Sequence, residues 1–257
     1  MNPVAGIGRL FLDTLGEVGR LVIFAMRGTL SAVSIPFYIR PFFGALLRIG
    51  FTSLPVVGLT AIFTGGALAL NIYEGRLFEN VESFLPQILG VSIVRELGPV
   101  LAALMVAGRC SSAMAAEIGA MRVTEQIDAM STLSVDPFRY LIGPRILATT
   151  IAMPLLVLIA DIIGVFGGYL VSVYLLDMAA PVYINNLTDF VGLDDVTSGL
   201  IKATVFGYLI AVMGSYYGYC SGGGASGVGN ATRTAVVAAA VSIFAANYIL
   251  TSLFVEF

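Results

Sequence analysis

Long runs of apolar residues, separated by short polar segments, fill this chain from residue 49 onward. Each run holds about 20 or more residues with almost no charge, the length that an α-helix needs to cross the hydrocarbon core of a bilayer. The pattern predicts an all-α integral membrane protein with five transmembrane helices, at residues 49–73, 86–116, 146–173, 200–219 and 234–255.

The first 48 residues have a different pattern, in which seven charged residues interrupt the apolar stretches: Arg9, Asp13, Glu17, Arg20, Arg27, Arg40 and Arg48. Such mixed segments are typical of helices that lie in the membrane interface, with arginines among the headgroups. Pro36 and Pro41 interrupt the segment further. We therefore divide the chain into an N-terminal interfacial helical segment, residues 1–48, and a transmembrane domain, residues 49–257.

The charges between the predicted spans indicate how the chain is oriented. Arginine gathers in the N-terminal segment, in the loop after the second span and just before the last span, whereas the loops after the first and third spans are acidic apart from Arg76. Short loops rich in arginine and lysine stay in the cytoplasm. We expect a cytoplasmic N-terminus and, after five spans, a periplasmic C-terminus.

Composition narrows the function further. Apolar residues make up 58% of the chain and charged residues 11%, against roughly a half and a quarter in soluble domains. The chain has no histidine, which excludes zinc-peptidase motifs and histidine-dependent serine catalysis. Its glycine-rich run, residues 221–230, lacks the Lys-Ser/Thr ending of a phosphate-binding loop and is expected to be a flexible turn. We predict no enzymatic activity, metal site, cofactor or nucleic-acid partner.

Small residues recur at every fourth position of the second span and beyond it. One row comprises Ala103, Ala107, Ser111, Ala115 and Gly119, and a second comprises Gly108, Ser112, Ala116 and Ala120. Small residues at this spacing let two helices approach closely in lipid. Two interpretations stay open: packing within one chain, and a seam between two copies of it.

The most informative polar residues are Arg95 and Glu96, which lie inside the second span. A charge there costs about 2.5 to 3.5 kcal/mol on insertion scales, and Pro99 leaves the carbonyl of Arg95 without its helical partner. A helix broken beside two charges is tolerated only against protein or a water-filled cavity. We therefore predict a substrate cavity at the centre of a dimer, open toward the periplasm, with Arg95 and Glu96 near its wall. The alternative is that these charges pair with other helices for structure alone.

Asp161 in the third span and Lys202 near the outer end of the fourth are the other charged candidates. Lysine is a suitable partner for a lipid phosphate, but Lys202 can equally extend its side chain to the outer interface. Asp161 is too short to do so. No spacing argument shows that the two residues converge with Arg95 and Glu96.

One stretch carries a dense set of motifs: residues 95–100 (Arg-Glu-Leu-Gly-Pro-Val), 107–109 (Ala-Gly-Arg), 115–121 (Ala-Ala-Glu-Ile-Gly-Ala-Met) and 123–130 (Val-Thr-Glu-Gln-Ile-Asp-Ala-Met). This stretch closely resembles the MlaE-type permeases, the membrane subunits of MCE-associated phospholipid ABC transporters. Asp136-Pro137, Pro144-Arg145 and the glycine-rich run fit the same pattern. The resemblance covers about residues 45–255.

The resemblance implies a permease subunit that moves phospholipids between the inner and outer membranes and contributes to outer-membrane lipid asymmetry. It implies a multi-pass homodimer in a bacterial inner membrane, bound to cytoplasmic ABC ATPase subunits, which carry the ATP and magnesium, and to a periplasmic ring of MCE-domain proteins. It also leaves room for a small cytoplasmic accessory subunit. From the intramembrane charges and the residues beside Pro99, we predict that Arg95, Glu96, Leu97, Val100, Asp161 and Lys202 bind the lipid.

In the same picture the N-terminal segment is an interfacial elbow helix, and residues 117–130 form a cytoplasmic coupling helix. Its contacts with the ATPase would come from Glu117, Met121, Glu125 and Asp128. Two other classes stay open from the residues alone. An ion-coupled secondary transporter would show acidic relays or inverted repeats, which are weak here, and a membrane scaffold would leave Arg95 and Glu96 unexplained.

Overall fold

The computed structural model describes residues 3–35, 38–75 and 81–255, and these residues are almost entirely helical. Pro36 and Arg76 lie outside the described residues. Five helices are long and apolar enough to cross a membrane: Ile39–Glu74, Ser83–Val123, Phe138–Tyr174, Leu193–Tyr219 and Gly224–Phe254. The prediction of an all-α membrane protein with five spans is confirmed.

The helices follow one another along the chain with short connections. In order they are α1 (Pro3–Val33), α2 (Ile39–Glu74), α3 (Val81–Ser92), the π-helical turn η1 (Ile93–Leu97), α4 (Gly98–Val106), the π-helical turn η2 (Ala107–Ser111), α5 (Ser112–Val123), α6 (Gln126–Thr132), the π-helical turn η3 (Phe138–Ile142), α7 (Gly143–Tyr174), α8 (Ala180–Phe190), α9 (Leu193–Tyr219) and α10 (Gly224–Val255).

The helices extend beyond the predicted spans. The first begins at Ile39 instead of residue 49, because Pro41 falls in its first turn, where a missing amide proton breaks no helical hydrogen bond. The boundary predicted at residue 48 therefore lies within α2. Likewise, most of the glycine-rich run is not a flexible turn. Only Gly223 and the first residue of α10, Gly224, have positive φ angles, of 79° and 74°, and α10 continues from there.

Pro99 does not break the second span, so that part of the prediction is wrong. The helix instead widens into the π-helical turn η1 just before Gly98 and continues through α4 to a second such turn, η2. Insertions of this kind redistribute backbone hydrogen bonds without ending the helix. The amide of Gly98, for example, donates to the carbonyl oxygen of Ile93. Ser83–Val123 consequently forms one irregular span of 41 residues.

The predicted coupling helix, residues 117–130, is in fact two helices. Its first half is the end of α5, and Glu125 then adopts a left-handed conformation, with φ of 60°, which ends the helix. The short helix α6 follows. The acidic loop between the third and fourth spans also holds a helix that the sequence analysis missed, α8, with Pro181 in its first turn.

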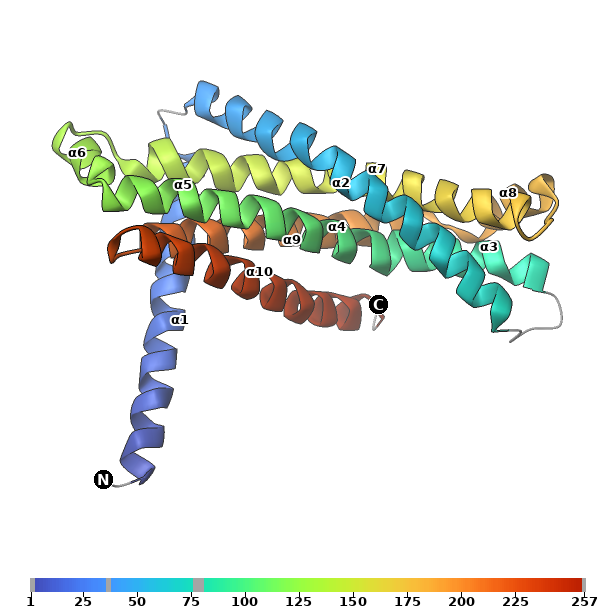
Figure 1. Ribbon diagram of the computed structural model, residues 1–257, viewed down its shortest axis with the longest axis horizontal. Coiled ribbons are helices and arrows are strands. Elements are labelled where there is room, and N and C mark those ends of the chain that lie inside the picture. The colour runs from blue at the N-terminus through green and yellow to red at the C-terminus, as the bar shows by residue number, and fades with distance from the viewer. Residues whose placement is uncertain (1–2, 36–37, 76–80, 256–257) are drawn as a thin grey trace.

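The spanning helices run side by side along the long axis of the molecule, and α1 leaves them at a steep angle (Figure 1). Glycines bring α2 and α7 into direct backbone contact. A Cβ atom at Gly65 would overlap the carbonyl oxygen of Gly164, and one at Gly167 would overlap that of Ile62. One end of the bundle carries α6 and the turn between α9 and α10, and the other carries α3 and α8.

Aromatic packing holds α1 to the bundle. Phe24 is buried, and its ring centroid lies 5.2 Å from that of Phe138, 5.4 Å from that of Tyr216 and 5.7 Å from that of Tyr219. The guanidinium of Arg27 stands 5.1 Å from the centroid of the Phe138 ring, a cation–π distance. The second half of α1 is thereby fixed beside η3 and the end of α9.

Candidate functional site

Glu96 and Lys202 form a partly buried ion pair where the second, fourth and fifth spans meet. The Lys202 ammonium donates to Glu96 Oε1 at 2.6 Å, and its side chain is only 1% exposed, whereas that of Glu96 is 34% exposed. Asn247 Nδ2 donates to Glu96 Oε2 at 3.1 Å, and the Thr251 hydroxyl lies 3.0 Å from Oε1. We call these four side chains the polar cluster.

The polar cluster also uses the carbonyl that Pro99 leaves free. Lys202 Nζ lies 3.1 Å from the carbonyl oxygen of Arg95 and 2.8 Å from the Thr251 hydroxyl. An ammonium group has three donors, and all three are directed at these two oxygens and at Glu96. Lys202 therefore does not extend to the outer interface, and no donor remains for a ligand. Lys202 therefore acts as a counter-ion that holds Glu96 in position.

Arg95 does not share this pair, because successive residues of a helix face different directions. Its guanidinium lies 3.9 Å from Asp195 Oδ1, at the start of α9, and the two side chains are 33% and 18% exposed. The structure thus places two ion pairs on adjacent residues of η1. Leu97 and Val100, one on each side of Gly98 and Pro99, are half-buried.

Asp161 lies apart from the polar cluster, on α7. Its carboxylate fits against Gly98, where any Cβ atom would collide with it, and its Oδ1 is buried without a hydrogen-bond partner in the described structure. It borders a cavity of about 510 Å³ whose other lining residues are Val94, Leu158, Ile162, Val165, Phe166, Tyr169, Tyr183, Ile184, Leu187 and Val196. Among the side chains of the four charged candidates, only those of Glu96 and Lys202 contact each other, and Arg95 contributes its backbone carbonyl to the pair.

The helix α8 covers this cavity. Tyr183 is buried and its hydroxyl donates to the carbonyl oxygen of Val165 at 3.2 Å. Burial raises the pKa of Tyr183 above its ordinary value, so the phenol keeps the proton that it donates. The cavity is apolar apart from Asp161 and the tyrosine hydroxyls, which suits hydrocarbon better than a polar ligand.

The sequence analysis missed Asn247, Thr251 and Asp195 as partners in this site. Asn247 and Thr251 are spaced i, i+4 within the last apolar span, which places them on one helix face. An amide in such a span needs a partner in the protein, and that signal pointed to Asn247. Asp195 carried no comparable signal, because it belongs to an acidic loop whose charges serve equally well as solvated residues.

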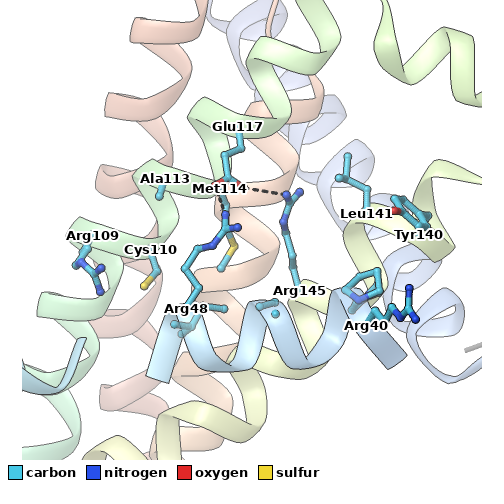
Figure 2. Close-up of a pocket in the computed structure, with 15 residues that line it drawn as sticks. Arg40, Arg48, Arg109, Cys110, Ala113, Met114, Glu117, Tyr140, Leu141 and Arg145 are labelled. Atoms are coloured by element: carbon cyan, nitrogen blue, oxygen red, sulfur yellow. Dashed lines mark hydrogen bonds and ion pairs between the residues drawn. The ribbon is translucent and has the colours of Figure 1, made fainter. Parts of the chain in front are cut away.

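The four predicted coupling residues lie at the α6 end of the bundle but differ in their surroundings. Glu117 turns inward and pairs with both Arg48 and Arg145, as Figure 2 shows. Asp128 bridges the break between α5 and α6 by accepting a bond of 2.6 Å from Arg122. Met121 is half-buried. Glu125, at the break, is exposed and makes no ion pair in the described structure.

The two rows of small residues have different environments. Ala103, Ala107, Ser111 and Ala115 are at most 1% exposed, and Gly214 and Gly218 of α9 approach the backbone of Ser111 and Ala115 closely. This row serves packing within the chain. In the second row Gly108 and Ala120 are exposed, and nothing described lies within 4 Å of a Cβ atom at Gly108.

Comparison with known proteins now identifies the family. A sequence model described as Permease MlaE matches residues 42–253. The chain belongs to the MlaE permease family. It is therefore an ABC transporter permease, a multi-pass membrane subunit of a transporter, and the resemblance carried by residues 95–130 is confirmed. This membership decides for the ABC transporter class over the ion-coupled transporter and the scaffold.

Three relatives illustrate the range of the MlaE family. A probable ABC transporter permease protein of Rickettsia bellii is 46% identical over 254 residues, which cover 99% of this chain and 98% of the relative. A second, from Synechocystis, is 38% identical over 202 residues, covering 79% and 77%. The intermembrane phospholipid transport system permease protein MlaE of Haemophilus influenzae is 32% identical over 261 residues, covering 98% and 97%.

Proposed function

We propose that this MlaE-family permease moves phospholipids between the inner and outer membranes, and that the polar cluster holds the headgroup end of its lipid pathway. The main observation behind this proposal is the Glu96–Lys202 pair, which is hydrogen-bonded to Asn247 and Thr251 within otherwise apolar spans. Buried ionisable residues in spans mark substrate pathways. The phospholipid transport named for the Haemophilus influenzae relative supports this reading.

The charged side chains of the site differ in exposure, and we assign them different roles on that basis. Glu96 and Arg95 each keep about a third of the side chain exposed, so these two groups are available to a zwitterionic or anionic headgroup. Lys202 is enclosed and keeps Glu96 in place. The cavity beside Asp161 has the apolar lining that an acyl chain requires, and Leu97 and Val100 border the route between them.

The assembly follows from the same proposal. The α6 end of the bundle carries Arg122, Arg139 and Arg233 on its loops and helix ends, which supports a cytoplasmic location and hence a cytoplasmic N-terminus and periplasmic C-terminus. In that orientation cytoplasmic ATPase subunits, which bind ATP and magnesium, dock at α6, and MCE-domain proteins dock at the periplasmic end of an inner-membrane complex. Co-purification of both partners with the chain from native membranes tests this assembly, and their absence would contradict it.

A homodimer completes the proposed transporter. Of the five spans, Gly224–Phe254 is the least buried, and its outer stripe is apolar, with Val237, Val241, Phe244 and Tyr248 all exposed. The exposed row at Gly108 lies on helices that contact α10. A Val241→Cys variant should form a disulfide with its own copy in membranes. Phe63→Cys, on an exposed face of α2, is the control and should remain reduced.

The decisive experiment replaces both charges of the pair. Glu96→Gln with Lys202→Met keeps side-chain volume and removes the charges together, so that neither is left buried alone. We expect ATP-dependent transfer of a radiolabelled phospholipid, measured in proteoliposomes with the ATPase and MCE partners, to fall at least about tenfold, the loss of one charge-assisted contact. The amount of co-purified ATPase should stay the same.

A matched control removes another pair of polar groups between helices. Thr29 and Tyr208 share a hydrogen bond of 3.0 Å between α1 and α9, and Thr29→Val with Tyr208→Phe should leave transfer within about twofold of the original. If the Glu96–Lys202 double variant transports lipid at the original rate, the pair serves structure alone and the proposed headgroup site is wrong.

A further inference from the structure

A second cavity, of about 440 Å³, lies near the α6 end of the bundle. It opens between the first turns of α2, the stretch from η2 to α5, and the start of α7 (Figure 2). Its distance from the polar cluster is large, because Glu96 and Glu117 are 21 residues apart on one helical span, roughly 31 Å at 1.5 Å per residue. This cavity is therefore a separate site.

Positive charge dominates this second cavity. Four arginines line it, Arg40, Arg48, Arg109 and Arg145, against the single carboxylate of Glu117, which leaves a formal charge of +3. Clustered guanidinium groups are the side chains that proteins most often present to phosphate, since their planar donors match its oxygens. The net positive charge of the cavity therefore favours binding of an anion.

The arginines are only partly satisfied by the protein. Glu117 serves both Arg48 and Arg145, yet Nη1 of Arg145 is buried without a hydrogen-bond partner in the described structure. Arg109 donates to the Ser53 hydroxyl at 3.0 Å, a neutral acceptor, and Arg40 makes no ion pair among the described residues. Excess donor capacity of this kind is stabilised by an acidic ligand.

The walls of the cavity are apolar, which distinguishes it from a site for a free anion. Pro41, Ala45, Ile49, Met114 and Leu141 contribute to the lining. On the same helix α2, the side chains of Phe43, Leu47 and Phe51 are exposed and apolar, so the rim continues into a surface suited to hydrocarbon. A ligand with a phosphate at one end and acyl chains at the other fits both parts.

We propose that this second cavity binds the phosphate group of a phospholipid, separately from the polar cluster. In the orientation proposed above, that lipid belongs to the cytoplasmic leaflet. The phosphate lies among Arg40, Arg48 and Arg109, and the acyl chains follow the outer face of α2. The leaflet rests on the proposed orientation of the chain, whereas the phosphate chemistry rests on the arginines alone.

The test places a photoreactive benzoylphenylalanine at Ala113, which lines the cavity and is exposed. The full-length chain is purified in detergent and irradiated with radiolabelled phosphatidylglycerol. We expect crosslinking at Ala113 to fall about tenfold in the Arg40→Gln/Arg109→Gln variant, which removes two cations that do not pair with Glu117. The same probe at Phe63 reports lipid on the outer face of α2 and should not change.

Three further variants serve as controls for this test. Glu117→Gln removes the competing carboxylate, so crosslinking at Ala113 should rise severalfold, in the direction opposite to the arginine variant. Arg233→Gln, which removes an exposed arginine outside the cavity, should have no effect. The Glu96→Gln/Lys202→Met variant should also leave the Ala113 signal intact, which separates this proposal from the transport site.

Two competitors identify the chemistry. Diacylglycerol has the same acyl chains but no phosphate and should not reduce the crosslinking of phosphatidylglycerol. Inorganic phosphate, at about 10-fold the concentration of phosphatidylglycerol, should not displace the lipid either, because the lipid binds through its phosphate and its acyl chains together. If diacylglycerol competes as well as unlabelled phosphatidylglycerol, the cavity binds acyl chains without recognising the phosphate. Displacement by inorganic phosphate would show a site for a free anion. Either result would overturn the proposal.

Discussion

The single lysine of the chain, Lys202, shows how a charge is accommodated among apolar helices. Moving it from water costs several kcal/mol unless its donors are satisfied, and here they reach Glu96, Thr251 and the carbonyl of Arg95. That carbonyl is free only because Pro99 cannot donate to it. The effect of the proline was predictable from sequence. The group that would use the freed carbonyl was not, because Lys202 is 107 residues away.

The pair makes a prediction about stability. Lys202→Met leaves the Glu96 carboxylate without its cation, and Glu96→Gln leaves the buried ammonium without its anion. Glu96→Gln should therefore lose about 3 to 5 kcal/mol of folding stability, because the ammonium left behind is fully enclosed. Lys202→Met should lose less, because the Glu96 carboxylate is 34% exposed and keeps Asn247 and Thr251 as partners. Both variants should show a lower thermal transition of the purified chain. The double variant should recover most of that loss. If the two single losses simply add in the double variant, the side chains act independently and the ion pair does not exist.

At the scale of helices, the π-helical turns explain why one row of small residues works. A strict four-residue repeat drifts about 40° per step around an α-helix of 3.6 residues per turn, so the row from Ala103 to Gly119 would leave its contact face. The wider turn η2, at Ala107–Ser111, takes up more residues per turn and offsets the drift. The four-residue spacing of the row could be recognised in the sequence, but the π-helical turn that keeps the row on one face could not be predicted from it.

The close contact between α2 and α7 gives a prediction with an internal control. Gly65→Ala places a methyl group on the backbone of Gly164, so the helices must separate, and we expect a loss of about 1 to 3 kcal/mol seen as a lower thermal transition. Gly50→Ala on the same helix meets nothing described within 4 Å and should be neutral or slightly stabilising. Equal effects of the two changes would contradict this account of the contact.

The break between α5 and α6 separates the residues that were assigned to coupling. Helix-forming composition predicted one continuous helix, but it could not reveal the left-handed Glu125, since only tertiary context selects such a conformation for a non-glycine residue. The break leaves Glu125 exposed at the end of the bundle, whereas Glu117, inside α5, pairs with arginines of the second cavity. The sequence therefore predicted helix in residues 117–130 but not the break within it, and the coupling role of these residues stays a prediction.

Charge reversal at Glu125 tests the coupling role. Glu125→Lys breaks no ion pair in the described structure, so it changes the surface without disturbing the fold, and we expect co-purification of the ATPase to fall about tenfold, as for a charge at an interface rim. Asp189→Lys, an exposed residue on α8 at the other end, is the matched control. ATPase binding that survives the change at Glu125 unaltered would remove this residue from the interface.

For the whole molecule, hydrophobic run length was enough to predict the number of spans, because bilayer thickness fixes the length of a spanning helix. It was not enough to locate their ends. Arg40 lies in the first turn of α2, and Arg145 lies within the span Phe138–Tyr174, beside Glu117. A prediction based on charge-free runs places both arginines outside a span. Only tertiary contacts show that charged residues continue these helices.

The two native cysteines allow the orientation to be measured. Cys220, between α9 and α10, is exposed and Cys110 is buried, so an impermeant maleimide should label Cys220 in inside-out vesicles only. Partial burial raises the pKa of the Cys220 thiol, so the thiolate is scarce at pH 7 and labelling should speed up about tenfold per pH unit as the pH rises toward that pKa.

The opposite end supplies the control for this measurement. Asp194→Cys in a Cys220→Ala background places the thiol at the start of α9 and should label in intact spheroplasts but not in sealed inside-out vesicles. Labelling of Cys220 in spheroplasts would reverse the proposed orientation of the chain.

The steep angle between α1 and the bundle (Figure 1) suits the interfacial placement that the sequence predicts for this helix, and that placement would fix the depth of the bundle in the bilayer. If α1 lies in the inner interface, its contact with Tyr216 marks that surface, and Lys202, 14 residues earlier on α9, stands roughly 21 Å above it. In a hydrocarbon core about 30 Å thick, roughly 9 Å then separate Lys202 from the far surface. In the orientation proposed above, a lipid of the periplasmic leaflet would reach the polar cluster by moving that distance into the bilayer, without crossing the midplane.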